Sequence, residues 1–331
     1  MIELRMATSR DIKKIIDFIR DHWHEKHIFV RWPALFSYCH HIYTDSVNYA
    51  LAMENDTIYG VCGYIASNRT ASPDVWVALW KVIPSGSPSL GLELLEYVRE
   101  KTNCRIFCCC GINKKVMKLY QFFGYHTGTL EHYYRLADRN TYHIALVKSR
   151  NILPATASAA SLIPLKADEL RSRLNQTTNQ KPYKDMEYIQ WRYYNHISYQ
   201  YQVYGIDNGL PGLDSVLITR EVSANGEKAL RVVDFIGIKE DLLLISSELQ
   251  LLLERSGYEY MDFYLWGIPE NILNSAGFIK RTSDDPNIIP NYFEPFTQEN
   301  IDIHFFSNEL DGFTMFKADG DQDRPNIIPG E

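Results

Sequence analysis

The sequence predicts an α/β fold of the mixed, α+β kind, built as two tandem domains that each contain a mixed, mostly antiparallel sheet flanked by helices. The chain has 331 residues, which is long for a single hydrophobic core. Segments with the two-residue period of strands alternate with segments that have the spacing of helices. Strands and helices recur in a similar order in the second half, which indicates a diverged tandem repeat.

The first half predicts a strand, a helix, a hairpin and then alternating strands and helices. A strand at 2–8 is followed by a helix that Ser9 caps, and two antiparallel strands within 47–67 turn at Glu54 to Asp56. An alternating strand, Asp74–Val82, leads into a loop of small residues and a helix at 89–101. The remaining elements are strands at 105–112, 127–136 and 142–148 and a helix at 113–124.

A segment rich in Ala, Ser and Pro, 151–165, is the best candidate for a linker. It predicts a first domain at 1–148, a linker at 149–164 and a second, degenerate domain at 165–331. The second domain is expected to contain strands at 199–206, 214–222, 229–238 and 260–268 and helices at 241–257 and 269–280.

Composition excludes several classes of function. The net charge is −7 and no long basic run is present, so nucleic acid is not expected as a partner. No apolar run approaches the roughly 20 residues that span a bilayer. The first residues lack the apolar core of a signal peptide, so a cytoplasmic protein is expected. Cys104, Cys108, Cys109 and Cys110 alternate faces of one strand, which predicts buried apolar fillers and no metal site.

The loop before the helix at 89–101 allows two interpretations. Ser87 is a good N-cap and Pro88 suits the first helical position, so the loop could simply start a helix. Gly86, Ser89 and Gly91 also crowd this helix terminus, where small residues and the helix dipole favour a bound anion. The second interpretation makes the loop a phosphate cradle.

The first half resembles the GNAT acyltransferases, which use acyl-coenzyme A. The donor loop of that family reads Gln/Arg-x-x-Gly-x-Gly/Ala, and here Gly86, Ser89 and Gly91 align with its Gln/Arg, first Gly and last small residue. A second family feature is an Asn, a Tyr seven residues later and a Gly-aromatic pair, which match Asn113, Tyr120 and Gly124-Tyr125. The departure at Gly86 leaves the backbone and helix dipole to hold the pyrophosphate.

The resemblance implies a binding site for acetyl-coenzyme A, as co-substrate and without a metal, in the first domain only. The backbone of a splayed fourth strand would hold the acyl group and pantetheine, and Tyr120 would be the general acid unless it only packs against the sheet. The implied donor-site residues are Trp80, Lys81, Val82, Ile83, Gly86, Ser87, Ser89, Leu90, Gly91 and Asn113. The second half lacks a glycine-rich loop and is expected to shape the acceptor site.

Candidate acceptor residues come from both halves. Histidine titrates near neutrality, so His22, His24 and His27 are candidate general bases; surface or core-edge histidines without a chemical role are the alternative. His27 is preferred because the resemblance implies a similar histidine just before an apolar pair, here Ile28-Phe29. Trp191, Arg192 and Tyr193 could form a wall that stacks on a sugar or base and grips a phosphate, or could pack within their own domain. Asp321 could hold an amino group or lie in a solvated acidic turn.

The whole chain looks similar to tandem GNAT-like proteins found with bacterial surface-polysaccharide genes, on the segments HWHEKH, WVALWKV, YIQWRYYNH and FKADGDQDRPN. That resemblance implies transfer of an acetyl group to the amine of a nucleotide-linked (UDP- or dTDP-) amino sugar, by a monomer or homodimer. Two alternatives stay open: a tRNA-dependent aminoacyl or peptidyl transferase with a doubled GNAT fold, and a non-catalytic binding protein on the same scaffold.

Overall fold

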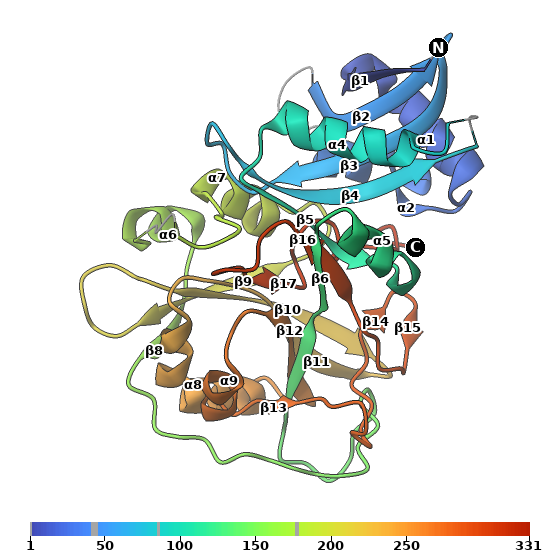
Figure 1. Cartoon of the computed structure of the whole chain (residues 1–331). Helices are drawn as coiled ribbons and strands as arrows, with labels where there is room; N and C mark the ends of the chain where they lie inside the picture. The colour runs from blue at the N-terminus through green and yellow to red at the C-terminus, as the bar shows by residue number, and fades with distance from the viewer. Residues whose placement is uncertain (1, 41–45, 85–86, 176–178) are drawn as a thin grey trace. The chain divides into compact units, whose positions relative to one another are not determined.

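The computed structural model describes residues 2–40, 46–84, 87–175 and 179–331 (Figure 1). The chain divides into two compact units. The first contains residues 1–127, 305–309 and 319–331, and the second contains 128–304 and 310–318. The expected linker, 149–164, therefore lies inside the second unit, and two C-terminal segments belong to the first unit.

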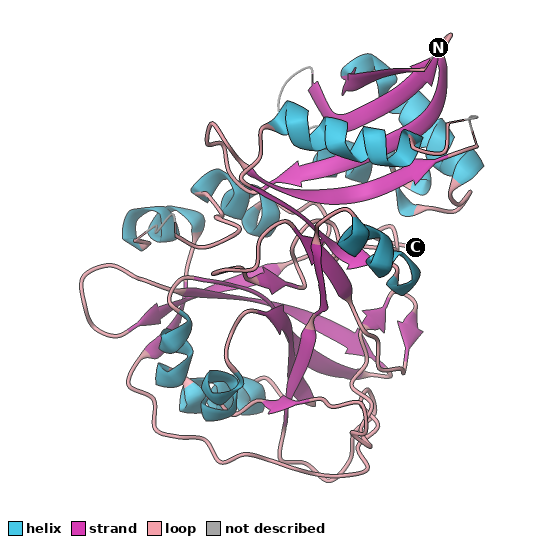
Figure 2. Cartoon of the chain, viewed as in Figure 1, coloured by secondary structure: helices cyan, strands magenta, loops and turns pink. Residues whose placement is uncertain are grey.

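The sheet of the first unit begins with the strand order β1-β2-β3-β4-β5. Strands β1 to β4 are antiparallel neighbours, whereas β5 runs parallel to β4 (Figure 2). Strands β16 and β6 follow β5 in the sheet. The bounds are β1 Glu3–Thr8, β2 Ser46–Glu54, β3 Thr57–Ala66, β4 Asp74–Val82, β5 Ile106–Ile112, β6 His126–Thr129 and β16 His304–Ser307.

Helices cover both faces of this sheet. Successive side chains of β2 point to opposite faces, and the side chains on each face are apolar. Tyr49 and Leu51 face a core with the first three helices, and Ala50 and Ala52 face a core with α4. The helices are α1 Ile12–His22, α2 Ile28–Arg31, α3 Pro33–His40, α4 Leu90–Thr102 and α5 Met117–Phe122, with 3₁₀ turns at Ser9–Asp11 and Lys114–Val116. Cys108, Cys109 and Cys110 are buried in β5, as expected, whereas Cys104 is only partly buried and precedes the strand.

Strands β4 and β5 are paired over only three residues. Asp74, Val75 and Trp76 lie opposite Ile106, Phe107 and Cys108, and the two strands then diverge. On its other edge, β4 carries a bulge, because Cys62 lies opposite Trp80 but Tyr64 lies opposite Val77. A bulge re-aims the strand that carries it. The second half of β4 therefore presents an edge that β5 does not cover.

The second unit is built on the strand order β13-β7-β12-β11-β10-β9-β8, with β17 on β12. Its strands are β7 Glu131–Leu136, β8 Ser161–Pro164, β9 Tyr201–Asp207, β10 Val216–Ala224, β11 Glu227–Ile236, β12 Tyr260–Trp266, β13 Ile279–Lys280 and β17 Met315–Phe316, and a separate hairpin pairs β14 Tyr292–Phe293 with β15 Phe296–Thr297. Its helices are α6 Ala167–Arg173, α7 Met186–Ile189, α8 Ser246–Arg255 and α9 Glu270–Ser275, with a π-helix at Gln190–Tyr194 and a 3₁₀ helix, η4, at Lys239–Leu244.

Two expectations for this region were wrong. The segment 142–148 is not a strand, because only Leu146 forms a bridge, to Ile288. The last four residues of the expected linker form β8, since they pair with β9. Among the described residues, no helix is long and apolar enough to cross a membrane.

The second unit repeats the arrangement of β4 and β5. Strands β11 and β12 are parallel over three residue pairs, from Leu230–Met261 to Val232–Phe263, with α8 between them in sequence. Beyond these pairs, a segment of the same unit, 315–318, forms hydrogen bonds with the edges of the two strands. Strand β17 pairs with β12 at Leu265 and Trp266, and the Ala318 amide donates to the Val233 carbonyl of β11 at 2.9 Å. The tandem repeat expected from the sequence is therefore present at this point of the fold.

Candidate active site

The uncovered edge of β4 presents main-chain amides. The Ile83 amide donates to the Tyr59 carbonyl of β3 at 2.9 Å. Because bonded and non-bonded pairs alternate in an antiparallel ladder, Lys81 also points its amide toward β3, and Trp80 and Val82 point theirs away. Of the four predicted backbone donors, Trp80 and Val82 thus face the open edge. The prediction of a free Ile83 amide is wrong, because the sheet uses it.

The loop after β4 leads into α4. Ser85 and the predicted Gly86 lie outside the described residues. The helix begins at Leu90, one residue later than expected, because Ser87 to Leu90 form a turn in which the Leu90 amide faces the Ser87 carbonyl at 3.4 Å. The Glu93 amide donates to the Ser89 carbonyl at 2.9 Å and makes the first hydrogen bond of the helix. The amides of Gly91 and Leu92 therefore lie at the open helix terminus. Leu90 itself is buried, and only its backbone could contact a ligand.

Gly91 also has a packing role. A Cβ atom at this position would lie 3.2 Å from Cζ2 of Trp80 and 3.4 Å from a methyl group of Val82. The missing side chain therefore lets α4 approach β4 closely. Glu93 receives a hydrogen bond from the Ser89 hydroxyl and places a negative charge in the first turn. The binding energy of an anion at this terminus would have to exceed its repulsion by the Glu93 carboxylate.

Tyr120 lies on α5 and is 4% exposed. Its ring stacks on Phe306, with centroids 4.3 Å apart, and lies 6.1 Å from the Trp80 ring. Burial raises the pKa of its hydroxyl, with smaller contributions from nearby cysteines. The phenol therefore stays protonated at neutral pH and could donate a hydrogen bond. The structure brings it next to Trp80, and this position suits both a packing role and an acid.

Asn113 caps the turn before α5. Its side-chain oxygen accepts a hydrogen bond from the Lys115 amide at 2.9 Å, and the residue is exposed. Capping explains an Asn at this position without a ligand.

His27 precedes α2 and is 9% exposed. Its Nδ1 accepts a hydrogen bond from the Phe29 amide at 3.2 Å, and its Nε2 lies 3.2 Å from an amino group of Arg324. Burial and, to a lesser extent, the positive charge of Arg324 lower its pKa to about 4. A neutral imidazole has one lone pair on its ring nitrogens, so the two donors compete for it. In this arrangement His27 has no nitrogen ready to take a proton from a substrate.

The residues that approach His27 come from the C-terminal segment, 319–331. Arg324 forms an ion pair with Asp321, and Arg31 binds Glu331 and the Asn326 carbonyl. A Cβ at Gly320 would lie 3.3 Å from Trp76 on β4, and Gln322 packs directly against Gly111 on β5. The segment therefore crosses β4 and β5 close to where they diverge, and Asp321 lies in this part of the first unit.

Sequence reasoning missed His40 and Tyr49. Both side chains are 0% exposed, their rings are 4.8 Å apart, and the Tyr49 hydroxyl lies over Gly63, opposite the bulge of β4. Burial lowers the pKa of His40 to about 4 and raises that of Tyr49, and Asp321 acts electrostatically on both. Within the described residues, the Tyr49 hydroxyl lacks a hydrogen-bond partner. No sequence pattern marks either residue.

The other predicted acceptor histidines lie at the surface. His22 ends α1, and the His24 Nδ1 accepts a hydrogen bond from the Lys26 amide at 3.1 Å. Both are exposed, and His24 is close enough to lower the pKa of His27 slightly. Among the described residues, no cluster of His, Cys, Asp or Glu could hold a metal ion.

The predicted aromatic wall of the second unit is corrected by the structure. Arg192 is 4% exposed and donates two hydrogen bonds to the Ala318 carbonyl, at 3.1 and 3.3 Å. Tyr193 is 2% exposed and donates to Asp234, which also binds the buried Lys184 at 2.6 Å. Trp191 is half-buried and lies beside Tyr188. Arg192 and Tyr193 serve the interior of their own unit, because burial requires such groups to be paired.

Solved structures with this architecture are known. A GCN5-related N-acetyltransferase from Anabaena variabilis matches 93% of this chain and 72% of its own length, with a TM-score of 0.57 and 10% identity. The chain has a GNAT fold. A probable N-acyltransferase from Enterococcus faecalis matches the same shares of both chains, with a TM-score of 0.52 and 8% identity. No protein-family model and no curated protein matches this chain.

Proposed function

We propose that this GNAT chain is an acyl-coenzyme A-dependent N-acyltransferase whose donor site lies in the first unit. The observation that carries the proposal is the edge of β4, which is left uncovered after Trp76 and leads directly to the open terminus of α4. The Trp80 and Val82 amides suit the carbonyls of an acyl-pantetheine chain. The amides of Gly91 and Leu92 suit a pyrophosphate.

In the proposed reaction, a neutral amine attacks the thioester carbon, the C–S bond breaks, and a thiolate leaves. Tyr120 is the proposed proton donor to that sulfur, because its hydroxyl is protonated and its ring lies beside Trp80. A full proton transfer from so weak an acid would be uphill, so its contribution would be a hydrogen bond that strengthens as negative charge develops on the sulfur.

The proposed acceptor site is formed by His27 and the C-terminal segment. Asp321 supplies a carboxylate that can hold the ammonium group of an incoming acceptor. His27, the predicted base, can accept the proton only after Arg324 gives up its contact with Nε2. An acceptor that binds Arg324 through an anionic group would release His27 in the same step.

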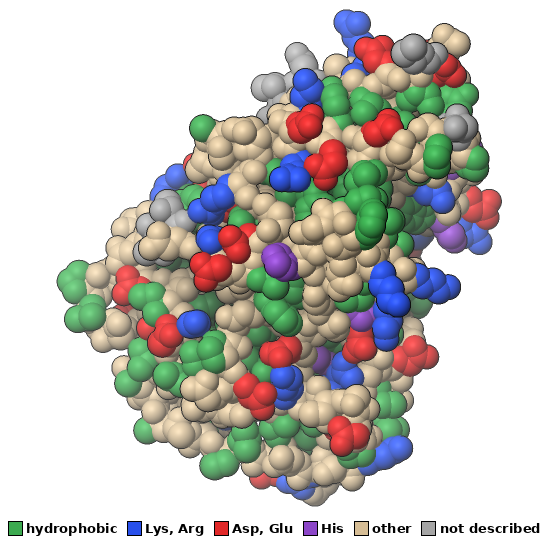
Figure 3. All heavy atoms as spheres, in the orientation of Figure 1, with side chains coloured by type: hydrophobic (Ala, Val, Ile, Leu, Met, Phe, Trp, Pro, Cys, Tyr) green, Lys and Arg blue, Asp and Glu red, His purple; other side chains and the backbone are tan. Residues whose placement is uncertain are grey.

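Such an acceptor carries both an amine and a negative charge. A nucleotide-linked amino sugar, with UDP or dTDP as carrier, meets this requirement and is the acceptor that we propose, in cytoplasmic synthesis of a surface polysaccharide. On the face shown in Figure 3, basic and acidic side chains are interspersed without a broad basic area, which favours this acceptor over tRNA. A binding protein without activity remains the alternative if no transfer is found.

The test is acetyl transfer from acetyl-coenzyme A to a panel of UDP- and dTDP-linked amino sugars, measured by thiol release and mass spectrometry. We expect one or more sugars to gain a single acetyl group and Asp321→Asn to raise the KM for that sugar more than for acetyl-coenzyme A. Glu331→Gln, which alters the same segment outside the His27 contacts, is the matched control. Binding of acetyl-coenzyme A without transfer to any amine would leave the protein as a binding module.

A further inference from the structure

The second unit contains a cavity of about 390 Å³ at the carboxyl ends of its two central parallel strands. It is lined by Phe235 and Gly237 at the end of β11, by Gly267 and Ile268 after β12, and by the start of η4. Ligands in α/β folds commonly bind in the crevice outside the carboxyl ends of parallel strands. The volume is within the range of small-molecule sites.

The segment that contains β17 separates the cavity from the gap between β11 and β12. Thr314 and Phe316, which line it, belong to the segment that pairs with β12 and continues to Ala318 on β11. A long pantetheine chain would need the backbone edge that this segment occupies. The cavity therefore suits a compact ligand and not a second acyl-coenzyme A.

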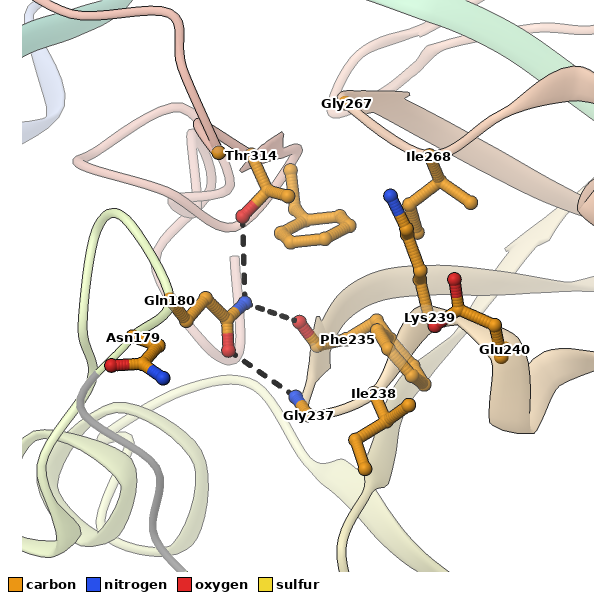
Figure 4. A pocket seen from close by; sticks show the side chains of 12 residues that line it. Asn179, Gln180, Phe235, Gly237, Ile238, Lys239, Glu240, Gly267, Ile268 and Thr314 are labelled. Atoms are coloured by element: carbon orange, nitrogen blue, oxygen red, sulfur yellow. Dashed lines mark hydrogen bonds between the residues drawn. The ribbon is translucent and has the colours of Figure 1, made fainter.

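Hydrogen bonds from Gln180 hold the cavity walls together (Figure 4). Its amide nitrogen donates to the Phe235 carbonyl at 3.2 Å and to the Thr314 hydroxyl at 3.4 Å, and its oxygen accepts from the Gly237 amide at 3.2 Å. One side chain thus connects β11 to the segment before β17. The cavity is preformed, which lowers the cost of ordering it around a ligand.

The lining combines an apolar floor with a few polar groups. Phe235, Ile268 and Phe316 form the floor, and the Asn179 carboxamide lies at one side. The Lys239 side chain extends along Ile268, across from Gln180 in Figure 4, and within the described residues its ammonium forms no ion pair. The charges of Lys239 and of Glu240 beside it sum to zero, so an anion would have to contact the ammonium directly, and the rim suits one anionic group and not several.

We propose that this cavity binds a phosphorylated nucleoside. The apolar floor would take the planar base, a carboxamide can pair with the hydrogen-bonding edge of a base, and the Lys239 ammonium would bind one phosphate. A pyrimidine or a purine nucleotide of compact size would meet these requirements. The proposal does not depend on acyl transfer, since it rests on the second unit alone.

The test is calorimetric titration of the full chain with UMP, dTMP and adenosine 3′,5′-bisphosphate. We expect at least one nucleotide to bind, and we expect Lys239→Glu to raise its Kd by tenfold or more. The Kd of Lys239→Ala should lie between those of the parent and Lys239→Glu. Lys148→Glu makes the same charge change on an exposed lysine of the same unit that does not line the cavity, and it should leave binding unchanged. Tighter binding of the pyrimidine nucleotides would identify a pyrimidine site, and tighter binding of the adenosine nucleotide would identify a purine site.

Two results would overturn the proposal. One is that none of the three nucleotides binds to the folded protein. The other is that binding is equally strong in Lys239→Glu and the parent, because the nucleotide would then lie elsewhere. Neither result bears on acetyl transfer, which is measured separately.

Discussion

The contact between Arg324 and His27 predicts how the pKa of the histidine should respond to substitution. Replacing Arg324 with methionine keeps much of the side-chain volume and removes the positive charge 3.2 Å from Nε2. Two unit charges about 4 Å apart interact by about 4 kcal/mol at an effective dielectric constant near 20, or about 3 pKa units. Because a quarter of the Arg324 side chain is exposed, water screens part of this interaction. We expect the pKa of His27 to rise from about 4 by about one unit or more.

The pKa should remain below the ordinary value of 6.5, because burial is the largest cause of the shift. The pKa of His27 is about 4 in the folded protein and 6.5 in the unfolded chain, so the unfolded chain takes up a proton more readily. The contribution of His27 to the free energy of unfolding is therefore present above pH 6.5 and is lost as the pH falls toward 4. In Arg324→Met this loss should span a narrower pH range.

The assay is a pH titration of the ring carbon resonances of labelled histidine, with His27→Gln used to assign the signal. Arg31→Met is the matched control, because Arg31 binds the same C-terminal segment without touching His27. A pKa that stays near 4 in Arg324→Met would refute the electrostatic reasoning and leave burial as the sole cause. Equal shifts in both variants would show instead that the whole segment had detached.

Three further outcomes follow from the structure. Tyr120→Phe should change the free energy of unfolding by less than about 1 kcal/mol, since no described residue forms a hydrogen bond with its hydroxyl. If Tyr120 is the acid, the same variant should lower kcat by about 10²–10⁴. A near-parental kcat would leave Tyr120 as a packing residue. Gly91→Leu should destabilise the protein by about 1–3 kcal/mol in denaturant titrations through overlap with Trp80, so unchanged stability would contradict the close packing. Arg192→Ala should cost about 1.5–3 kcal/mol of stability, and a selective rise in KM for the sugar in an equally stable variant would restore its predicted surface role.

The parts of the fold that repeat a local pattern could be predicted from the sequence. The alternation in Asp74–Val82 gave the bounds of β4, and the apolar spacing of Leu90, Leu94 and Val98 gave the helix that follows. Alternation alone misled at 142–148, because that segment finds no neighbouring strand beyond one bridge. Local patterns carry information about an element and none about its partner.

The missing part of the candidate site depends on distant contacts. Arg324 lies 297 residues from His27 in sequence, and its role follows from the path of the C-terminal segment across β4 and β5. Asp321 was noticed as part of an acidic turn, but its pairing with Arg324 and its proximity to His40 required the three-dimensional structure. Likewise, the sequence leaves two roles open for Arg192, in a ligand-facing wall or packed within its own domain, and only the contact with the distant Ala318 carbonyl distinguishes them.

The discontinuity of the first unit has a consequence for synthesis on the ribosome. Residues 1–127 emerge long before 305–309 and 319–331, which belong to the same compact unit. At a translation rate of about 5–20 residues per second, the nascent first unit would wait roughly 10–40 seconds for the last of the remaining segments. During that interval, Tyr120 and Phe107 lack the Phe306 ring that packs against them in the finished protein. The nascent chain thus exposes apolar surface that a chaperone could bind until the last segments leave the exit tunnel.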